Sequence, residues 1–583
     1  MENKFLKGGA FLIEDSAPND VLIPEEFDDE IAMIRQTTRD FCQNEIVPNM
    51  ERLEKQEPGL SQALLRKLGE LGIFGIEVEE KYDGSSLSKL AATVVAEEMS
   101  RAAGFSVSVG AHMTIGMLPI VYFGNEQQKS HYLPKMVACD LIGAYALTEP
   151  ESGSDAMGAK TQAVLSEDGK HWILNGTKMW ISNGGFADVF IIFAKVDGER
   201  KNFSAFIVER AHGVKSGAEE KKMGIKSSST TQLMLENVEV PVENLLGEIG
   251  DGAKIAFNIL NVGRFKLGAG GVGSCKIILE ICSKYAKERE QFKQPIASFG
   301  LIQEKLGEMA ARTFALESAT YRTIGYIDAL IGDNEDQAHK LAAIEEYALE
   351  CSLAKVLGTE VMDFCADEGV QLHGGYGYSQ DYVIEQIYRD SRINRLFEGT
   401  NEINRLLVPG RLLKSAAKGN LPLFDAIGEA ASGLGDNAKE EGAFAAERAG
   451  VKNFKRCALI VLGAAANAFG NALEREQEVL GRIADIIMET YAAESALLRA
   501  QKLNLSGKCD DAHIAAVRVY VSAAAENIAQ WSRTALSRFL KDEALAQQLA
   551  FVQELTKLQP IDTIGLTRAL AQTVLETEGY PFS

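Results

Sequence analysis

Residues 389–405 read RDSRINRLFEGTNEINR, with a glutamate, Glu398, at the centre and Gly399 directly after it. Because glycine has no side chain, a flat ligand can approach the backbone beside this carboxylate closely. A second unusual stretch, HGGYGY at residues 373–378, lies upstream. Together the two stretches predict a ligand-facing turn, a short helix and then a carboxylate delivered to a pocket. The alternative is that Glu398 is simply one of 82 acidic residues, placed at a helix end.

Length and charge limit the function classes. A chain of 583 residues is too long for a single core, so we expect three or four domains. Its 46% hydrophobic and 24% charged residues are ordinary for a soluble globular protein. The net charge of −22 repels phosphate backbones, which argues against nucleic-acid binding. It also provides no general attraction to anionic membranes, although a local basic patch could still act.

Cysteine and histidine are dispersed along the chain. The eight cysteines form no CxxC pair, a pattern that favours reduced thiols in a cytosol over a disulfide framework or a zinc site. The seven histidines are also scattered, so we predict no structural metal. The N-terminal sequence MENKFLKGGAFLIED carries acids and no apolar core, unlike a secretory signal. The apolar run 457–466 is too short to span a bilayer.

The first 143 residues are predicted to form a helical domain. Apolar residues recur at near-helical spacing in 25–47, 60–73 and 88–99. Gly72 can cap the second of these helices. The small-residue segment Gly110-Ala111-His112 either lines a cavity or joins two helices.

A β domain is expected over residues 144–251. The segment from Tyr145 to Asp155 is a short strand followed by a loop rich in hydroxyls, which suits a polar ligand. The next segments are β-branched and aromatic, with an Asn-Gly turn, and predict antiparallel strands. Trp180 either packs in the core, the commoner fate of a strand tryptophan, or flanks a planar ring.

Helices return from residue 252 onward. The small-residue run 268–273 permits close helix packing, and further helices are expected over 301–330 and 336–368. These long helices predict a four-helix bundle over 252–412. Arg264, a lone cation near the glycine run, would ordinarily be a surface residue. Residues 420–583 are predicted to form an appended helical domain, with amphipathic helices over 451–503, 509–540 and 543–579.

Five motifs in order, YxLTEP…SGSD, MWISNGG, ERxQF, QLHGGYGY and FEGTNE, resemble the acyl-CoA dehydrogenase family over about residues 30–410. The stretches GAHMTIG and LNVGRFKLG and the C-terminal extension look most like its very-long-chain branch. The resemblance implies a mainly α fold with a central antiparallel β-barrel, a four-helix bundle and a C-terminal helical domain. The implied domain limits are 1–143, 144–251, 252–412 and 420–583.

The resemblance implies FAD as prosthetic group. The isoalloxazine site of the family corresponds to Tyr145, Leu147, Thr148, Trp180 and Ser182. Serine at 182 replaces the usual threonine and keeps its hydroxyl. A homodimer or a higher oligomer is implied, because residues of the neighbouring subunit complete the site; these correspond to Arg289, Gln291, Phe292, Gln371 and Gly375. Thr400 and Glu402 match cofactor contacts just past the base, although many relatives have an amide or an aspartate in place of Glu402. Gly300 replaces a glutamine common in the family.

The resemblance also implies the chemistry. Glu398 would remove the α-proton of an acyl-CoA while the β-hydrogen leaves as hydride to the flavin, giving trans-2-enoyl-CoA in fatty acid β-oxidation. Some branches place the base at the position of Gly263, which cannot serve here. Ser154, Arg264 and Gly399 match positions that contact the CoA ester. Gly110 would leave a deep cavity, which favours long acyl chains.

Two other functions stay open. An acyl-CoA oxidase would pass electrons to oxygen, whereas a dehydrogenase would use electron-transfer flavoprotein, the acceptor expected for the family. A non-enzymatic assembly or scaffold protein on the same fold is disfavoured by the presence of Glu398 and the flavin motifs. We expect a bacterial-type cytoplasmic protein; membrane contact through the appended domain is an alternative that the overall acidity does not favour.

Overall fold

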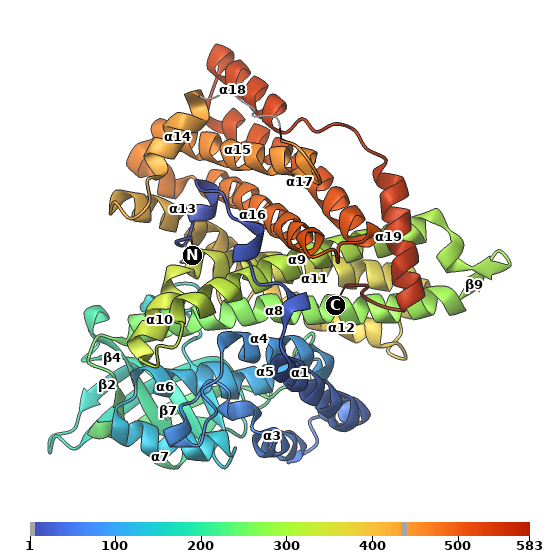
Figure 1. Ribbon diagram of the computed structural model, residues 1–583. Coiled ribbons are helices and arrows are strands. Elements are labelled where there is room, and N and C mark those ends of the chain that lie inside the picture. The colour runs from blue at the N-terminus through green and yellow to red at the C-terminus, as the bar shows by residue number, and fades with distance from the viewer. Residues whose placement is uncertain (1–5, 433–439, 583) are drawn as a thin grey trace.

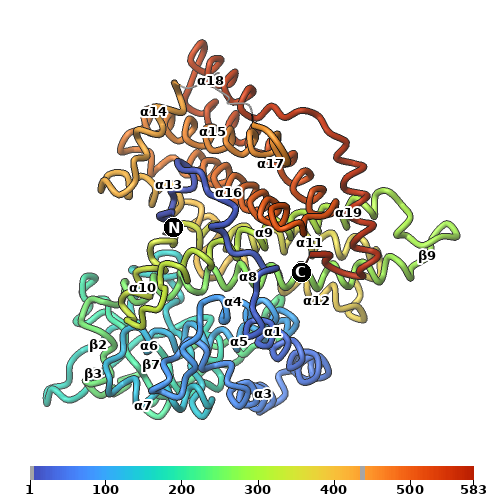
Figure 2. The backbone as a smooth tube through the Cα atoms, in the orientation of Figure 1, coloured from blue at the N-terminus to red at the C-terminus, as the bar shows by residue number. Residues whose placement is uncertain are grey.

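The computed structural model describes residues 6–432 and 440–582. Figure 1 shows them as stacked layers: N-terminal helices and a sheet at one end, long helices in the middle, and a further helical layer at the other end. The tube in Figure 2 shows the N-terminal segment running from the last layer, past the long helices, to α1. Residues 433–439, which fall in the predicted appended domain, lie outside the described residues.

Short helices form the N-terminal layer, as predicted. They are α1 (Asp29–Phe41), α2 (Met50–Glu54), α3 (Leu60–Glu70), α4 (Lys89–Glu98), α5 (Phe105–Gly110), α6 (Leu118–Phe123) and α7 (Glu126–Val137). Gly72 has a positive φ just beyond α3, as its capping role requires. Gly110 ends α5 and is followed by a π-helical turn, Ala111–Gly116, so this segment does join two helices. Such π turns are frequent at functional sites.

The central sheet is mixed rather than wholly antiparallel, which corrects the sequence-based expectation. Its strands are β1 (Gly143–Ala146), β2 (Gln162–Leu165), β3 (His171–Ser182), β4 (Val189–Val196), β5 (Phe203–Glu209), β6 (Lys215–Ser216), β7 (Thr230–Pro241) and β8 (Leu245–Leu246). The order is β6-β7-β3-β2-β4-β5-β8. Both β1 and β2 pair with β4 in parallel, because the loop between them leaves and rejoins the same edge of β4.

Long helices make the middle layer. They are α8 (Gly252–Glu288), α9 (Gly300–Ile331), α10 (Gln337–Glu346), α11 (Ala348–His373), α12 (Val383–Ser391) and α13 (Asn401–Ala417). The predicted small-residue packing is real: a Cβ on Gly271 would lie 2.6 Å from the carbonyl oxygen of Gly358 on α11. The predicted helix 336–368 is two helices. The backbone leaves the helical conformation at Tyr347 (φ −94°, ψ 22°), whose hydroxyl group donates a hydrogen bond to the carbonyl of Leu6.

The C-terminal layer contains α14 (Leu423–Ser432), α15 (Ala445–Phe469), α16 (Gln477–Leu505), α17 (Asp511–Phe539), α18 (Asp542–Leu555) and α19 (Thr563–Thr577). Two predicted helices are each divided in the structure. The predicted helix 451–503 breaks at Gly470, whose φ is positive, and the predicted helix 543–579 breaks around Pro560, which cannot continue a helix. The predicted helix 509–540 is confirmed as α17.

Two helical stretches are long and apolar enough to cross a membrane by length and composition alone: Phe105–Phe123 and Ala445–Arg475. The second contains the run 457–466, which covers ten residues of this longer helix. The first stretch is mostly buried inside the protein and the second is half buried. Buried helices of a folded protein pass the same test.

A buried ion network joins the three layers. Glu317 of α9 accepts hydrogen bonds from Arg499 of α16 (2.6 Å) and from the hydroxyl of Tyr580 (2.6 Å), and it pairs with Lys276 of α8 (2.5 Å). Lys276 also bonds Glu97 of α4 at 2.7 Å. Removing one partner would leave an uncompensated buried charge, so the network fixes how the layers meet.

Helix α19 packs closely on α9 through two glycines. A Cβ on Gly307 would lie 2.2 Å from the backbone carbonyl oxygen of Thr567, and one on Gly300 would lie 2.8 Å from the guanidinium of Arg568. The contact at Gly307 is with backbone, which cannot move aside, whereas the guanidinium of Arg568 at Gly300 is the flexible end of a side chain.

Gly307→Ala should destabilise the protein, although alanine is the better helix former by about 1 kcal/mol. The added methyl group meets backbone that cannot move aside, at a cost of about 1–3 kcal/mol. Gly481→Ala is the matched control, because a Cβ there meets nothing within 4 Å. Thermal unfolding should show a lower Tm for Gly307→Ala and an equal or higher Tm for Gly481→Ala; equal gains would contradict the packing.

Candidate active site

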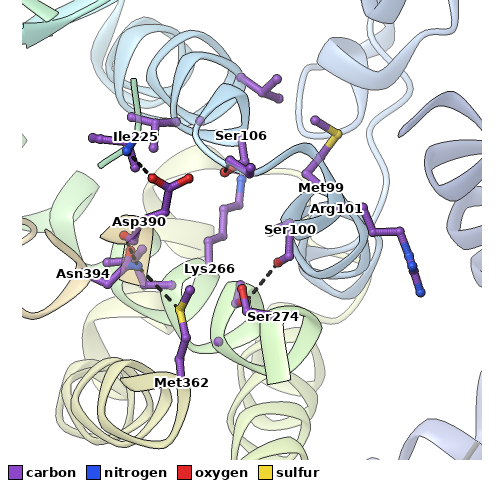
Figure 3. Close-up of a pocket in the computed structure, with 18 of the residues that line it drawn as sticks. Met99, Ser100, Arg101, Ser106, Ile225, Lys266, Ser274, Met362, Asp390 and Asn394 are labelled. Atoms are coloured by element: carbon purple, nitrogen blue, oxygen red, sulfur yellow. Dashed lines mark hydrogen bonds between the residues drawn. The ribbon is translucent and has the colours of Figure 1, made fainter. Parts of the chain in front are cut away.

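A cavity of about 470 Å³ lies between the N-terminal helices, α8, α11 and α12. Its walls are mainly apolar, and it brings together three predicted site residues: Gly110, Ser182 and Glu398. A Cβ on Gly110 would meet nothing within 4 Å, so this glycine leaves open space in the cavity. Figure 3 shows Met99 and Ser100 on one side, Asp390 and Asn394 on another, and Lys266 of α8 between them.

Glu398 reaches the cavity from a strained turn. Its φ is +57° and that of Gly399 is +81°, a left-handed pair between the helical turn 392–395 and α13. Backbone strain of this kind persists only where the surroundings hold it, and it clusters at functional sites. The Oε2 atom is buried and has no hydrogen-bond partner in the described chain.

Gly263 on α8 makes room for the carboxylate. A Cβ at this position would lie 2.6 Å from Oε2 of Glu398. Positions 263 and 398 therefore compete for the same space, and a side chain at 263 would displace the glutamate. The geometry therefore agrees with the prediction that Glu398, and not position 263, supplies the base.

Three side chains hold the carbonyl groups of the turn. Lys355 of α11 donates to the carbonyl of Gly399 at 2.9 Å, and Asn404 donates to the same oxygen at 2.8 Å. Arg264 donates to the carbonyl of Glu398 at 3.4 Å. Arg264 is only 5% exposed, so the expectation that it lies at the surface was wrong. The turn is thus fixed by its backbone, which leaves the carboxylate of Glu398 free.

Burial raises the pKa of Glu398 to about 7, and the nearby charges of Arg264 and Lys355 oppose part of that shift. Burial also lowers the pKa of Lys355 to about 8. A carboxyl group with a pKa near neutrality is well suited to take up a proton and release it again. Tyr145 lies within the electrostatic reach of Glu398, which together with burial raises the pKa of its phenol.

Lys355 and Asn404 were not anticipated from the sequence. Lys355 is the one charged residue in the segment CSLAKVLGT, residues 351–359, and it is fully buried. A lone lysine in an apolar helix is a detectable signal, because a buried ammonium group needs a partner. Its partners are the carbonyl of Gly399 (2.9 Å) and the side-chain oxygen of Asn401 (2.6 Å), both far along the chain, which only the fold reveals.

The predicted flavin-ring residues lie on β1, β3 and the loop after β1. Trp180 sits where the β3–β7 register shifts, with φ +60°, and is 57% exposed, so it is not a core residue. Tyr145 is buried against Phe193, and its hydroxyl has no partner in the described chain. Leu147 is buried and Thr148 partly exposed.

A second cleft, of about 770 Å³, lies at the other end of α8. It is lined by three predicted residues, Arg289, Gln291 and Gly375. Phe292 is 88% exposed at the tip of the β9–β10 hairpin, Glu290–Gln291 and Gln294–Pro295, which projects from the body in Figure 1. Gln371 is exposed near the end of α11.

The remaining predicted residues are spread around the turn and the β domain. Thr400 caps α13 by accepting a hydrogen bond from the N–H of Ile403 at 3.2 Å, so it has a structural role of its own. Glu402 is exposed in the first turn of α13. Ser154 is exposed on the loop after β1 and lines neither the cavity nor the second cleft.

These residues fit a flavin dinucleotide. The exposed indole of Trp180, beside Ser182 at the cavity, offers a flat apolar face. In the second cleft, a Cβ on Gly374 or Gly375 would meet nothing within 4 Å, and the Arg289 guanidinium lies 5.2 Å from the Tyr376 ring centre. Bare backbone beside a cation suits a phosphate group. Among the described residues, no three His, Cys, Asp or Glu side chains form a group that could hold a metal ion.

Comparison with known proteins agrees with this geometry. Domain profiles of the acyl-CoA dehydrogenase family match at residues 28–140 (N-terminal domain), 144–238 (middle domain), and 250–413 and 453–554 (both described as C-terminal domain). A probable acyl-CoA dehydrogenase of Bacillus subtilis is 47% identical, over 98% of each chain. The mitochondrial very long-chain specific acyl-CoA dehydrogenase of Rattus norvegicus is 37% identical over 78% of this chain and 71% of its own.

A solved structure extends the likeness to the whole fold. The acyl-CoA dehydrogenase from Bacillus anthracis, complexed with FAD, superimposes with a TM-score of 0.96 at 49% identity, covering 99% of this chain and 100% of its own. The same fold, including the C-terminal helical domain, is therefore present in both proteins. The chain belongs to the acyl-CoA dehydrogenase family.

Proposed function

We propose that this FAD-dependent acyl-CoA dehydrogenase oxidises long-chain acyl-CoA thioesters to trans-2-enoyl-CoA, the first step of fatty acid β-oxidation, with Glu398 as the base. The observation that carries the assignment is the Glu398 carboxylate: it faces an apolar cavity, has an unpartnered oxygen and has a pKa raised to about 7. FAD supplies the acceptor for the β-hydrogen, which leaves as a hydride.

The protein's own part is proton removal and orientation. The α-proton of a thioester is only weakly acidic, so a base in a dry site needs both a raised pKa and a fixed position. The strained turn fixes Glu398 through Arg264, Lys355 and Asn404. The backbone N–H of Glu398 would donate to the thioester oxygen and stabilise the negative charge that develops there.

The length of the cavity supports a long acyl chain. One face of α8 lines it from Gly263, beside the base, to Ile277, which at 1.5 Å per residue is about 21 Å. Carbon–carbon bonds of about 1.5 Å advance an extended acyl chain by about 1.3 Å per carbon, so this wall matches about 16 carbons. Gly110 adds to the space because it fills none.

A homodimer would complete the FAD site. Gly263, at the cavity, and Glu288, next to Arg289 in the second cleft, lie about 38 Å apart along α8. This distance exceeds the length of an extended FAD molecule, so the two predicted groups of one chain cannot hold the same FAD. A second copy that brings its Arg289, Gln291, Phe292, Gln371 and Gly375 to the first would solve this, and it would cover the exposed ring of Phe292.

Electron-transfer flavoprotein is the acceptor we infer, from the family resemblance, in a bacterial-type cytoplasm. Oxygen consumption during turnover of an acyl-CoA would instead identify an oxidase. Purified protein with no flavin and no turnover would favour the scaffold alternative. The presence of Glu398 at the apolar cavity, together with the residues that fit FAD, favours the dehydrogenase.

Glu398→Gln should bind FAD and acyl-CoA normally but reduce turnover by about 10²–10⁴-fold, because an amide cannot accept the α-proton. The measurement is an anaerobic titration with palmitoyl-CoA, followed by bleaching of the flavin absorption band. In the wild type only the deprotonated carboxylate is active, so kcat/KM should rise with pH through about 7. Substantial activity in Glu398→Gln would show that another group is the base.

Lys355→Met should lower kcat by about 10- to 100-fold, the effect of losing a charged hydrogen bond to the turn. Because the cation of Lys355 lowers the pKa of Glu398, its removal should also move the rise of kcat/KM to higher pH. Lys355→Arg keeps the charge and should retain the wild-type pH profile better. A lower rate with an unshifted profile would mean that Lys355 serves only stability.

Gly110→Leu should lower kcat/KM for palmitoyl-CoA by about tenfold or more, while butyryl-CoA is little affected. The φ at this position is −63°, so a side chain is tolerated by the backbone and only the cavity changes. Gly110→Ala should give an intermediate loss. If both chain lengths fall equally in steady-state assays, the cavity beside Gly110 does not hold the acyl chain.

A further inference from the structure

The wall of the cavity formed by α12 carries two polar side chains without full partners. Asp390 is 6% exposed; its Oδ1 accepts a hydrogen bond from the N–H of Ile225, and its Oδ2 has no partner in the described chain. Gln386 is 9% exposed, and its Nε2 likewise has no partner there. The two residues lie four apart, on one face of α12, and both line the cavity. In Figure 3 a dashed line joins one oxygen of Asp390 to Ile225, and the other oxygen lies on the side of Lys266.

Unpaired polar groups in a dry cavity are costly. A plain hydrocarbon chain would leave both groups without a partner, or would require a trapped water molecule between them. The Oδ2 atom needs a donor and the Nε2 group needs an acceptor. A hydroxyl group supplies both at once.

The position of the pair along the cavity follows from the packing of α12. At one end, Glu398 touches Gly263 of α8; at the other, a Cβ on Gly369 would meet both Ile384 of α12 (2.6 Å) and Ile278 of α8 (3.3 Å). The segment 383–398 therefore runs along α8 in the opposite direction. By this alignment Asp390 and Gln386 lie about 12–18 Å beyond the base, which corresponds to roughly carbons 10 to 15 of an extended acyl chain.

We propose that Asp390 and Gln386 form a hydroxyl-binding subsite, which makes acyl-CoA thioesters with a mid-chain hydroxyl group preferred substrates of this enzyme. The inference rests on the proposed function and specifies its substrate class. Asp390 Oδ2 accepts a hydrogen bond from the hydroxyl, and Gln386 Nε2 donates one to its oxygen. The hydroxyl takes no part in the reaction, which still removes one α- and one β-hydrogen.

The first test compares binding, which does not depend on turnover. Holoenzyme carrying Glu398→Gln is titrated calorimetrically with stearoyl-CoA, 6-hydroxystearoyl-CoA, 10-hydroxystearoyl-CoA and 12-hydroxystearoyl-CoA. The 10- or 12-hydroxy compound should bind about tenfold more tightly than stearoyl-CoA, the gain expected of one or two buried hydrogen bonds. The 6-hydroxy compound should show no such gain, because its hydroxyl lies about 5 Å short of the pair on an extended chain. Equal or weaker binding of both the 10- and 12-hydroxy compounds than of stearoyl-CoA would overturn the proposal.

Variants of the pair locate the effect. Gln386→Leu removes the donor with little change in volume, and Asp390→Asn keeps an oxygen for the N–H of Ile225. In the Glu398→Gln background, either variant should abolish the preference, so that the hydroxylated and plain chains bind with about equal affinity. The affinity for stearoyl-CoA should stay within about threefold of its value without the second substitution. Ile387→Val, on the same helix and also lining the cavity, is the matched control and should keep the preference. A preference unchanged in both pair variants would overturn the subsite.

Turnover in the wild type distinguishes a failure of the proposed function from a failure of the hydroxyl-binding subsite. The kcat/KM values for the hydroxylated and plain chains should differ in the same ratio as the affinities. If no acyl-CoA reduces the flavin, the proposed function fails, whereas the binding ratio still decides the subsite. If Gln386→Leu improves stearoyl-CoA binding and no hydroxylated chain is preferred, the pair holds only water and the proposal is wrong.

Discussion

The left-handed turn at Glu398 and Gly399 is the constraint on which the candidate site depends. A glutamate in this conformation is strained, and the strain is held by hydrogen bonds to the turn's carbonyl groups from α8, α11 and α13. These partners bind the backbone and leave the carboxylate unpartnered. The carboxylate in turn fits only because Gly263 has no side chain. The position, the burial and the raised pKa of Glu398 therefore all follow from this turn.

Helix α8 organises the rest of the site around this turn. Its Gly263 faces the base, its next four turns line the cavity, and its end leads into the hairpin and the second cleft. The glycines along α8 allow α11 to approach closely, which brings Lys355 to the turn. The same helix that shapes the acyl cavity thus also holds apart the two groups of residues assigned to FAD.

The buried ions explain how an added domain can be an integral part of the fold. Glu97 lies in the N-terminal layer, Lys276 and Glu317 lie in the middle layer, and Arg499 lies in the C-terminal layer, so the network is complete only when the three layers are assembled. Helix α19 then packs on α9 over Gly307, where any side chain would collide with the backbone of Thr567. The C-terminal layer is therefore fixed both by charge pairing and by close backbone contact.

The sequence by itself determined the family, the order of helical, β and helical parts, and Glu398 as the candidate base. It could do so because motifs such as FEGTNE and QLHGGYGY are local, and because helical periodicity is read within a few turns. The strand directions around β4, the breaks at Tyr347 and Gly470, and the roles of Lys355, Asp390 and Gln386 were decided only by the tertiary structure. Each of these depends on a partner distant in sequence, such as the carbonyl of Gly399 for Lys355 or the cavity for Asp390, and no local pattern contains that partner.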